Sequence, residues 1–508
     1  MWKQYTFLLL LLGFRLIAVA QVDSLPIEKV YIHFDRPSYS FGDTCRYKAY
    51  VIAAPELSLS TVSGVLYVDW LDQDFNVIEQ QRLKVTAGVA EGNFAFNHTP
   101  SGIYVARAYT RWMRNFDPAF FFKQAFDVAE DSSSHPSTSV SKNNAIHVSF
   151  HPEGGRSVQN IPTKLALRTA NEFGEGIDVE ADVVDESGQI ISRLQTTNGG
   201  MVAIPYVPGN KKYWLKLPSG DRVAFPAADP EGVVMNINNA DTDKLFISFS
   251  RSDDFERKDF TLIGFHEGRR CFTSDVILKK NLKQIVVSKR DLPSGIIQLS
   301  LFDEKGSLHC ERFIFIDNTK KHHIQVAKRI QNDSISLDLK TLGPESNALP
   351  ISLSASLQYD NPGLTGNTLN TLNTIFPYLL LIADCKTSII LSAERLNVES
   401  KQNNADIDLM MLAHDWRRTD WDSKTNKQSK PFKYRPEKGI AIQGTAKDAG
   451  SKKPISEGAI TLVVDDRYYK GIYTGKTDSI GNFRIEDIDF GDSTVLVWQV
   501  QDNQGRTR

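Results

Sequence analysis

The feature that most constrains the fold of this chain is a turn motif, Asp-x-x-Gly, which recurs directly after strand-like segments. It occurs at residues 185–188, 303–306, 478–481 and 502–505. The aspartate carboxylate can accept hydrogen bonds from the backbone of the turn, and the glycine can adopt the positive φ that leads into the next strand. The recurrence predicts β-hairpins and one architecture repeated along the chain.

Segments in which apolar and polar residues alternate surround these turns. The clearest near the N-terminus are "VYIHF", "CRYKAYV", "GVLYVDWLD" and "GIYVARAYTRWM". No long stretch with a helical period interrupts them, so we expect an antiparallel β-sandwich of about 100 residues there. Because 508 residues are too many for one core, the chain should contain roughly three to five domains.

We therefore predict an all-β protein, a string of β-sandwich domains with a short helical insertion. Sandwiches are expected at residues 26–128, 145–228 and 229–318, and a fourth β domain with a helical segment at 319–421. A serine-rich linker at residues 129–144 and a basic, polar linker at 422–438 separate these parts from a final β-sandwich at 439–508.

The helical segment is expected around "DIDLMMLAHDWRR". Asp406 is a candidate N-cap, and Ile407, Met410, Met411 and Trp416 have the spacing of one buried face.

Residues 1–20 have the pattern of an export signal. Lys3 precedes an apolar run from Phe7, and Ala18-Val19-Ala20 offers a cleavage site before Gln21. The run is too short to span a bilayer, so we expect an exported protein; an uncleaved anchor or a buried segment is the alternative. The four cysteines lie far apart without a C-x-x-C pair, and both two disulfides and buried free thiols stay open.

Several short motifs resemble sites of chemistry without meeting its requirements. "GIYTGKT" at residues 471–477 has one residue too few between its glycines for a phosphate loop, and a turn and strand follow it. "HEGRR" at 266–270 has no second histidine one turn later, and His322 and His323 would point to opposite faces of a strand. Glu153, in "EGG", is expected in a glycine turn rather than as a functional carboxylate. No catalytic, cofactor-binding or metal-binding residue is therefore assigned.

The stretch at residues 28–51, "EKVYIHFDRPSYSFGDTCRYKAYV", places His33, Asp35 and Cys45 close together. His33 and Asp35 would share a strand face, which a metal or nucleophilic site could use. Asp35 directly precedes Arg36-Pro37, however, and Cys45 follows a second turn at Gly42-Asp43. The pattern favours two strands and their turns, with Cys45 packed inside.

The same stretch, with "SGVLYVDWLD" and "SGIYVARAYTRWMRNF", resembles the second macroglobulin domain of the α2-macroglobulin superfamily. It resembles more closely still the exported Bacteroidetes-type proteins that carry this domain. "VSFHPEGGRSVQNIPTKLALRT" and "GIIQLSLFDEKGSLHCERFIFI" are similar to further macroglobulin-like domains of that group, and "DLMMLAHDWRRTDW" is similar to its helical signature.

The C-terminal part, "IQGTAKDAGSKKPISEGAITLVV" with "TDSIGNFRI", resembles the carboxypeptidase regulatory-like domain, a transthyretin-like β-sandwich. In similar proteins this domain often precedes a plug domain of TonB-dependent outer-membrane receptors. The chain ends about where such a sandwich would need its last strand, which suggests a truncated or split product.

The chain departs from the thioester-bearing macroglobulins in one decisive way. Those proteins carry G-C-G-E-Q, and none of the cysteines here lies in that context: Cys45, Cys271, Cys310 and Cys385. Covalent capture of a protease is therefore excluded.

These observations lead us to expect a non-enzymatic, cofactor-free binding or assembly protein of the periplasm or outer-membrane face. Its partner would be an envelope protein, for which the resemblance suggests outer-membrane transport components or a protease. The net charge of −2 gives no field to attract nucleic acid. Two alternatives stay open: a macroglobulin-type endopeptidase inhibitor without a thioester, and a glycan-binding or glycan-processing protein. The last would need a carboxylate pair in a cleft lined by Trp or Tyr, and burial of Trp112, Trp416 and Trp421 in cores would count against it.

Overall fold

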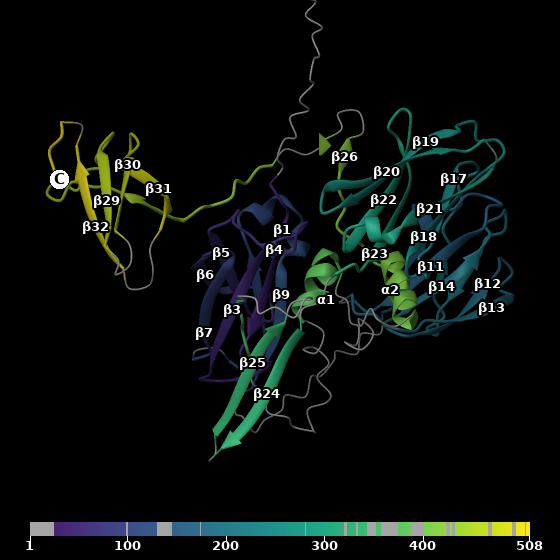
Figure 1. Cartoon of the computed structure of the whole chain (residues 1–508), viewed down its shortest axis with the longest axis horizontal. Coiled ribbons are helices and arrows are strands. Elements are labelled where there is room, and N and C mark those ends of the chain that lie inside the picture. Colours follow the sequence, from purple (N-terminus) through teal and green to yellow (C-terminus); the bar gives the residue numbers. More distant parts are fainter. Residues whose placement is uncertain are drawn as a thin grey trace, which may run out of the picture.

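The computed structural model describes residues 25–97, 100–129, 145–172, 174–279, 281–319, 323–331, 334–342, 352–356, 374–387, 401–422, 427–428, 432–465, 470–489, 494–502 and 504–507. The predicted export signal and most of the predicted linker at 129–144 lie outside these ranges. Within them the chain is built mainly of antiparallel β-sheets, with two α-helices (Figure 1). The predicted all-β fold class with a short helical insertion is confirmed.

The first sandwich encloses an aromatic core. One sheet contains β1 (Glu28–Phe34), β3 (Thr44–Ala53), β4 (Ser58–Leu59) and β7 (Val89–Ala95). The other has the order β2 (Tyr39–Ser40), β9 (Phe122–Ala129), β8 (Gly102–Tyr109), β5 (Val65–Leu71) and β6 (Val77–Lys84). Trp70 of β5 is fully buried between the sheets and stacks on Phe94 of β7 with ring centroids 4.2 Å apart. Aromatic alternation in these strands therefore supplies the core.

The second and third sandwiches follow the same plan. The second pairs β10 (His147–Pro152), β11 (Thr163–Ala170) and β14 (Met201–Tyr206) in one sheet, and β13 (Ile190–Gln195), β12 (Glu180–Val184), β15 (Trp214–Lys216) and β16 (Arg222–Ala224) in the other. In the third sandwich, one sheet has the order β17 (Val233–Asn238), β18 (Lys244–Arg251) and β21 (Leu282–Ser288). The other sheet has the order β20 (Arg269–Ile277), β19 (Asp259–His266), β22 (Gly295–Asp303) and β23 (Leu308–Ile316).

All nine residues of β22 are buried, which is unusual for a strand of a two-layer sandwich. Ile297, Leu299 and Leu301 belong to the core of the third sandwich. On the opposite face, Ile296 packs with residues of the helical segment, and Gln298 Oε1 accepts a hydrogen bond from the Thr419 amide at 2.7 Å. The mostly apolar segment "GIIQLSLF" is thus covered on both faces, and its two polar residues, Gln298 and Ser300, are buried as well.

Residues 323–428 contribute a ribbon and two helices. β24 (His323–Gln331) and β25 (Ser334–Leu342) pair only with each other among the described strands, and the ribbon projects from the body of the molecule (Figure 1). Helix α1 (Ile375–Leu380) adds Tyr378 and Leu379 to the core of the first sandwich. Helix α2 (Lys401–Ala413) packs against β10, β11, β14 and β23, between the second and third sandwiches. The short strands β26 (Trp421–Asp422) and β27 (Lys427–Gln428) follow.

The predicted helix is confirmed, but the predicted N-cap is wrong. Because α2 begins at Lys401, Asp406 lies inside the helix, where its carboxylate accepts a hydrogen bond from Asn198 at 3.1 Å. Ile407, Met410 and Met411 are buried as the spacing predicts.

The C-terminal sandwich has β28 (Ile440–Thr445) and β31 (Asn482–Ile488) in one sheet and β30 (Lys470–Lys476), β29 (Ala459–Asp465) and β32 (Val495–Gln501) in the other. The residues directly before β28 lie against the first sandwich. We call residues 432–438 the strap; they form the end of the region predicted as a linker. The domain boundaries drawn from the sequence stay predictions.

The four Asp-x-x-Gly turns form as predicted. In each, the glycine amide donates to the aspartate carbonyl oxygen over 2.9–3.1 Å, and the glycine φ lies between 77° and 86°. The carboxylate accepts from the amides two and four residues later. A fifth turn of this kind, at Asp72, has Phe75 at the position of positive φ (62°), so the sequence pattern missed it.

No helix among the described residues is long and apolar enough to cross a membrane.

The turn geometry makes a prediction about Gly188. Gly188→Ala should lower the free energy of unfolding by about 1–2 kcal/mol, because alanine resists the left-handed backbone. The new Cβ would meet only the end of the Arg222 side chain, at 3.1 Å. Gly209→Ala, in the same sandwich, is the control, since that glycine has open space around it and no left-handed φ. Equal unfolding curves in urea for the two variants would contradict this account.

Candidate functional site

The predicted His33, Asp35 and Cys45 cluster does not form a common site. His33 Nδ1 lies 2.7 Å from Ser354 Oγ, whereas Asp35 accepts hydrogen bonds from the Tyr39 hydroxyl at 2.7 Å and the Arg46 amide at 3.0 Å. Cys45 is fully buried in the core of the first sandwich. Asp35 therefore fastens the turn to the start of β3, and no group of three potential metal ligands occurs among the described residues.

All four cysteines are free thiols, which decides between the two possibilities left open by the sequence. Burial raises the pKa of Cys45 and Cys310 to about 12, and that of Cys271 and Cys385 to about 11. Because the thiolate is the reactive form, these side chains are unreactive near neutral pH.

The other short motifs singled out in the sequence lie in strands or in buried parts of the fold. Residues 471–476 lie in β30, antiparallel to β29, so "GIYTGKT" is a strand. His266 is buried and its Nδ1 lies 3.1 Å from the Ile296 carbonyl oxygen. Trp112 and Trp416 are 3% and 2% exposed, which counts against a glycan site built on them. His322 and the Trp421 side chain lie outside the described residues.

A buried ion network that the sequence did not reveal joins the first and third sandwiches to the helical segment. Lys29 of β1 is 1% exposed, and its Nζ donates to Asp384 at 2.6 Å, to Glu267 at 2.5 Å and to the Leu379 carbonyl oxygen at 2.8 Å. Arg417 Nε lies 2.9 Å from the other Asp384 oxygen. Two cations and two anions thus balance in a buried site, which is the condition for keeping charges out of water.

The ionisation of this network follows from its geometry. Burial alone would raise the pKa of Asp384, but Lys29 and Arg417 outweigh it and hold the pKa below the usual value. Burial would likewise lower the pKa of Lys29, and Asp384 and Glu267 together raise it above the usual value. Lys29 and Asp384 are therefore both charged at neutral pH.

Glu267 holds its place in the network at a conformational cost. It occupies the tight turn between β19 and β20 with φ of 47°, beside Gly268 with φ of 78°. A turn with two positive φ values ordinarily takes Asn-Gly or Asp-Gly. The ion pair with Lys29 accounts for a glutamate at this position.

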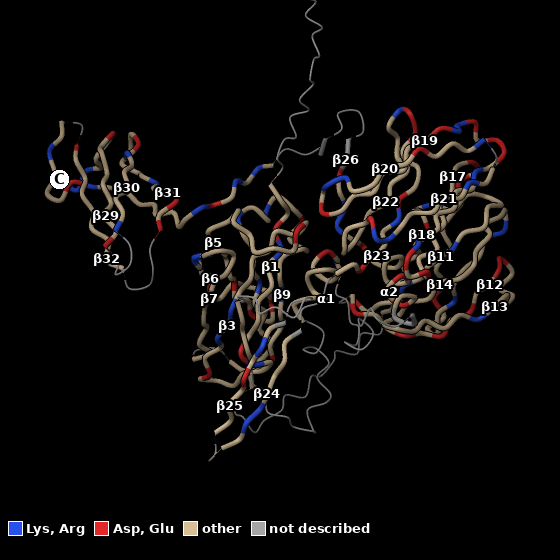
Figure 2. The backbone as a smooth tube through the Cα atoms, in the orientation of Figure 1, with Lys and Arg blue, Asp and Glu red and all other residues tan. Residues whose placement is uncertain are grey.

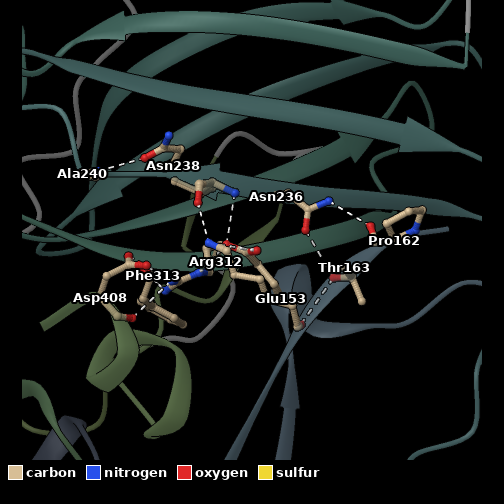
Figure 3. A network of polar contacts seen from close by, with 11 residues as sticks. Glu153, Pro162, Thr163, Asn236, Asn238, Ala240, Arg312, Phe313 and Asp408 are labelled. Atoms are coloured by element: carbon tan, nitrogen blue, oxygen red, sulfur yellow. Dashed lines mark hydrogen bonds and ion pairs between the residues drawn. The ribbon is translucent and has the colours of Figure 1, made fainter. Parts of the chain in front are cut away.

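A second network joins the second and third sandwiches to α2 (Figure 3). Glu153 is completely buried and accepts from the Ile237 amide at 3.1 Å, while Arg312 Nε lies 3.5 Å from the same carboxylate oxygen. Arg312 also donates to the Asp408 carboxylate at 3.0 Å. Burial raises the pKa of Glu153, although Arg312 and Lys164 oppose it. The carboxylate considered in the sequence is thus an interdomain contact, held by a turn in which Gly154 has φ of 80°.

The β24–β25 ribbon presents an exposed apolar face. Its strands pair over nine positions, and the register places on one face the following residues, which are 40–66% exposed: Ile324, Val326, Ile330, Ile335, Leu337 and Leu339. Lys328 interrupts this face, whereas Arg329, Lys340 and the only acid of the two strands, Asp338, lie on the opposite face. Two-stranded ribbons are marginally stable alone, so burial of this face would stabilise the ribbon.

Comparison with known proteins gives similarity in structure only. No protein-family model matches the sequence, and no curated protein matches it. Among solved structures, the chain aligns with Escherichia coli α2-macroglobulin activated by porcine elastase. The alignment covers 93% of this chain and 42% of the macroglobulin chain, at 10% sequence identity and a TM-score of 0.24. The alignment with Salmonella α2-macroglobulin reacted with methylamine covers 93% of this chain and 38% of the macroglobulin chain, at 9% sequence identity and a TM-score of 0.18.

Dimeric latent PorU from Porphyromonas gingivalis aligns with 57% of this chain and 34% of its own, at 12% identity and a TM-score of 0.25. The chain spans about two fifths of the length of the macroglobulins with which it aligns. The similarity is to multidomain β-sandwich proteins. Scores at this level carry no inference about activity, and the β-sandwich assignment rests on the sheets described above.

The first network makes a prediction about Lys29. Lys29→Met should lower the free energy of unfolding by about 3–5 kcal/mol, because buried Glu267 loses its cation and Asp384 loses one of its two. Lys470→Met is the matched control: its ion pair with Asp465 is exposed, so the change should stay within about 0.5 kcal/mol. Urea unfolding at neutral pH measures both, and a Lys29→Met variant as stable as the control would contradict the assignment.

The same network predicts how stability depends on acid. Because the pKa of Asp384 is lower in the folded than in the unfolded chain, its contribution is present above about pH 4 and is lost as the pH falls through the folded value. The difference in unfolding free energy between wild type and Lys29→Met should therefore shrink below about pH 4. A difference that stays constant through this window would show that Asp384 does not depend on Lys29.

Proposed function

We propose that this chain is a non-enzymatic, exported binding and assembly protein of the bacterial cell envelope, with the β24–β25 ribbon as its partner-binding element. The observation that carries the proposal is the ribbon's one-sided apolar face. Six apolar side chains at strand spacing stand exposed there, and in water such a surface favours association. The partner class, outer-membrane transport components, follows from the sequence resemblance.

The occupant we assign to this face is a β-strand or sheet edge of a partner protein with an apolar face and acidic flanks. Both long edges of the ribbon offer backbone groups for strand addition, since neither strand has a third neighbour among the described residues. Arg329 pairs with Asp338, and the positive charge left by Lys328 and Lys340 favours an acidic partner and disfavours a second copy of the same ribbon. Figure 2 shows basic positions along β24.

The buried networks support this role by fixing the body from which the ribbon projects. Lys29 connects the first sandwich to Glu267 of the third, and Arg312 connects the third to Glu153 of the second, through buried contacts. A binding element gains affinity when its supports are already ordered, because less conformational entropy is lost on association.

Site-specific photo-crosslinking tests the proposal. A photo-reactive amino acid at Val326, on the apolar face, should form an adduct of defined mass in envelope preparations from cells expressing the full chain. The same amino acid at Gln325, on the opposite face, is the matched control. The partner is then identified by mass spectrometry and purified. Its direct binding should weaken about tenfold or more in Ile335→Lys, because a charge would enter the apolar contact.

Three outcomes would overturn the assignment. Equal adducts at Val326 and Gln325 would indicate random collision. An adduct within the chain would make the face an internal contact, and an adduct only with a second copy would make it a dimer interface.

A further inference from the structure

The strap is seated closely along the first sandwich. The Gly64 amide donates to the Glu437 carbonyl oxygen at 2.6 Å, and Asn115 exchanges two hydrogen bonds of 2.7 Å with the backbone of Tyr434. A Cβ atom at Gly64 would lie 2.0 Å from the Lys438 carbonyl oxygen. Glycine at this position therefore permits the strap to approach the sheet.

A cleft of about 680 Å³ lies between the strap, the outer face of the β5–β8 sheet and β31. Five arginines from separate parts of the chain line it: Arg82, Arg107, Arg111, Arg114 and Arg484. Its volume is in the range of sites for small organic ligands. Figure 2 shows basic positions along the strap itself.

Carboxylates neutralise three of these arginines. Arg107 binds Asp69 with distances of 2.7 and 3.1 Å, Arg111 lies 3.3 Å from Glu437, and Arg484 lies 2.7 Å from Glu486. Within the part of the chain that the structure describes, Arg82 and Arg114 have no carboxylate within 4 Å. The cleft therefore keeps positive charge that its own residues do not balance.

Aromatic rings hold the two unneutralised arginines in place. The Arg82 guanidinium lies 5.7 Å from the centre of the Tyr67 ring, and that of Arg114 lies 4.3 Å from the centre of the Tyr434 ring. Tyr67 in turn stacks beside Tyr109, with ring planes 9° apart. Arg114 Nη2 also donates to the Tyr434 hydroxyl at 3.4 Å. Stacking on a ring orders a guanidinium, and its remaining N–H groups can bind an oxyanion.

The Tyr67 hydroxyl adds a fixed donor at the edge of the cleft. It donates to Glu437 at 2.8 Å. Burial, followed by the contact with Glu437, raises the pKa of Tyr67 to about 12, so the hydroxyl stays protonated at neutral pH. This bond ties the one lining carboxylate, which belongs to the strap, to the sheet.

We propose that this strap cleft binds a phosphate monoester, carried by a small soluble molecule or by a lipid headgroup, with Arg82 and Arg114 as the phosphate-binding residues. A phosphate monoester carries close to two negative charges at neutral pH, which matches the two unneutralised cations. Guanidinium groups present several N–H donors in a plane that fits phosphate oxygens, and such charge-assisted hydrogen bonds are strong. The site is separate from the β24–β25 ribbon, so a test of ligand binding in the cleft does not depend on whether the ribbon binds a partner.

Calorimetric titration of the full chain with glucose 6-phosphate tests the proposal, with glucose as the uncharged control. Glucose 6-phosphate should bind, glucose should not, and affinity should fall as salt is raised. Arg82→Gln and Arg114→Gln should each weaken binding about tenfold or more, the usual effect of losing a charged hydrogen bond. Arg290→Gln should leave it unchanged, since Arg290 is an exposed residue of the third sandwich.

Phosphatidylcholine vesicles with and without lipid A form a second arm of the same test. Binding to lipid A vesicles alone assigns the site to a phosphorylated headgroup, and binding to the free sugar phosphate assigns it to a soluble ligand. Either result supports the phosphate chemistry. Failure of both probes, equal binding of glucose, or equal effects of Arg82→Gln and Arg290→Gln would overturn it.

The Gly64→Ala variant distinguishes a ligand site that includes the strap from a patch of arginines on the sheet surface. This substitution retains every arginine but forces the strap away, because the Lys438 backbone occupies the space of the new side chain. Binding of the probe that binds the wild type should fall about tenfold or more as the cleft opens. Unchanged affinity in a folded Gly64→Ala variant would place the ligand on the sheet surface and refute a site that includes the strap.

Discussion

The buried ammonium group of Lys29 is the contact on which the placement of the first and third sandwiches and the helical segment depends most. Its three hydrogen bonds go to a turn of the third sandwich, to α1 and to Asp384, so one side chain satisfies groups from three parts of the chain. A buried ion network adds little net stability over apolar packing, yet it strongly penalises any arrangement that leaves one charge unpaired. We interpret this network as a device that specifies one relative placement of the sandwiches. The glutamate in a left-handed turn position at Glu267 agrees with that role.

The second network applies the same principle at the other side of the helical segment. Arg312 bridges Glu153 and Asp408, and α2 buries Met410 against both neighbouring sandwiches. The helices α1 and α2 therefore contribute apolar side chains to the sandwich cores. The charged residues Asp384 and Asp408 form ion pairs with Lys29 and Arg312 of the sandwiches. This explains why β22 is buried on both faces. The helices join the sandwiches together, which their position in the sequence alone did not indicate.

Local chemistry was predictable and distant pairing was not. The Asp-x-x-Gly turns, the strand alternation and the buried face of α2 depend on residues within a few positions of one another, and they formed as expected. The turn at Phe75 was missed because its left-handed residue is not glycine. The partners of Lys29 lie 238 and 355 residues away, and no spacing rule links them. In the sequence, Gly64 indicated only the start of a strand. The structure shows why this position needs glycine: the backbone of Lys438 lies against it.

The net charge of −2 gave no indication of a positively charged site, and the structure shows why such a total is a poor guide. The arginines of the strap cleft come from β6, β8, the turns after β8 and β31, where each is an ordinary surface residue of its own strand or turn. Folding brings them into one cleft, and salt limits the reach of charges elsewhere to about 8 Å at physiological ionic strength. The local excess is therefore what a ligand in the cleft experiences. Surface carboxylates on the distant sandwiches set the net charge without cancelling it.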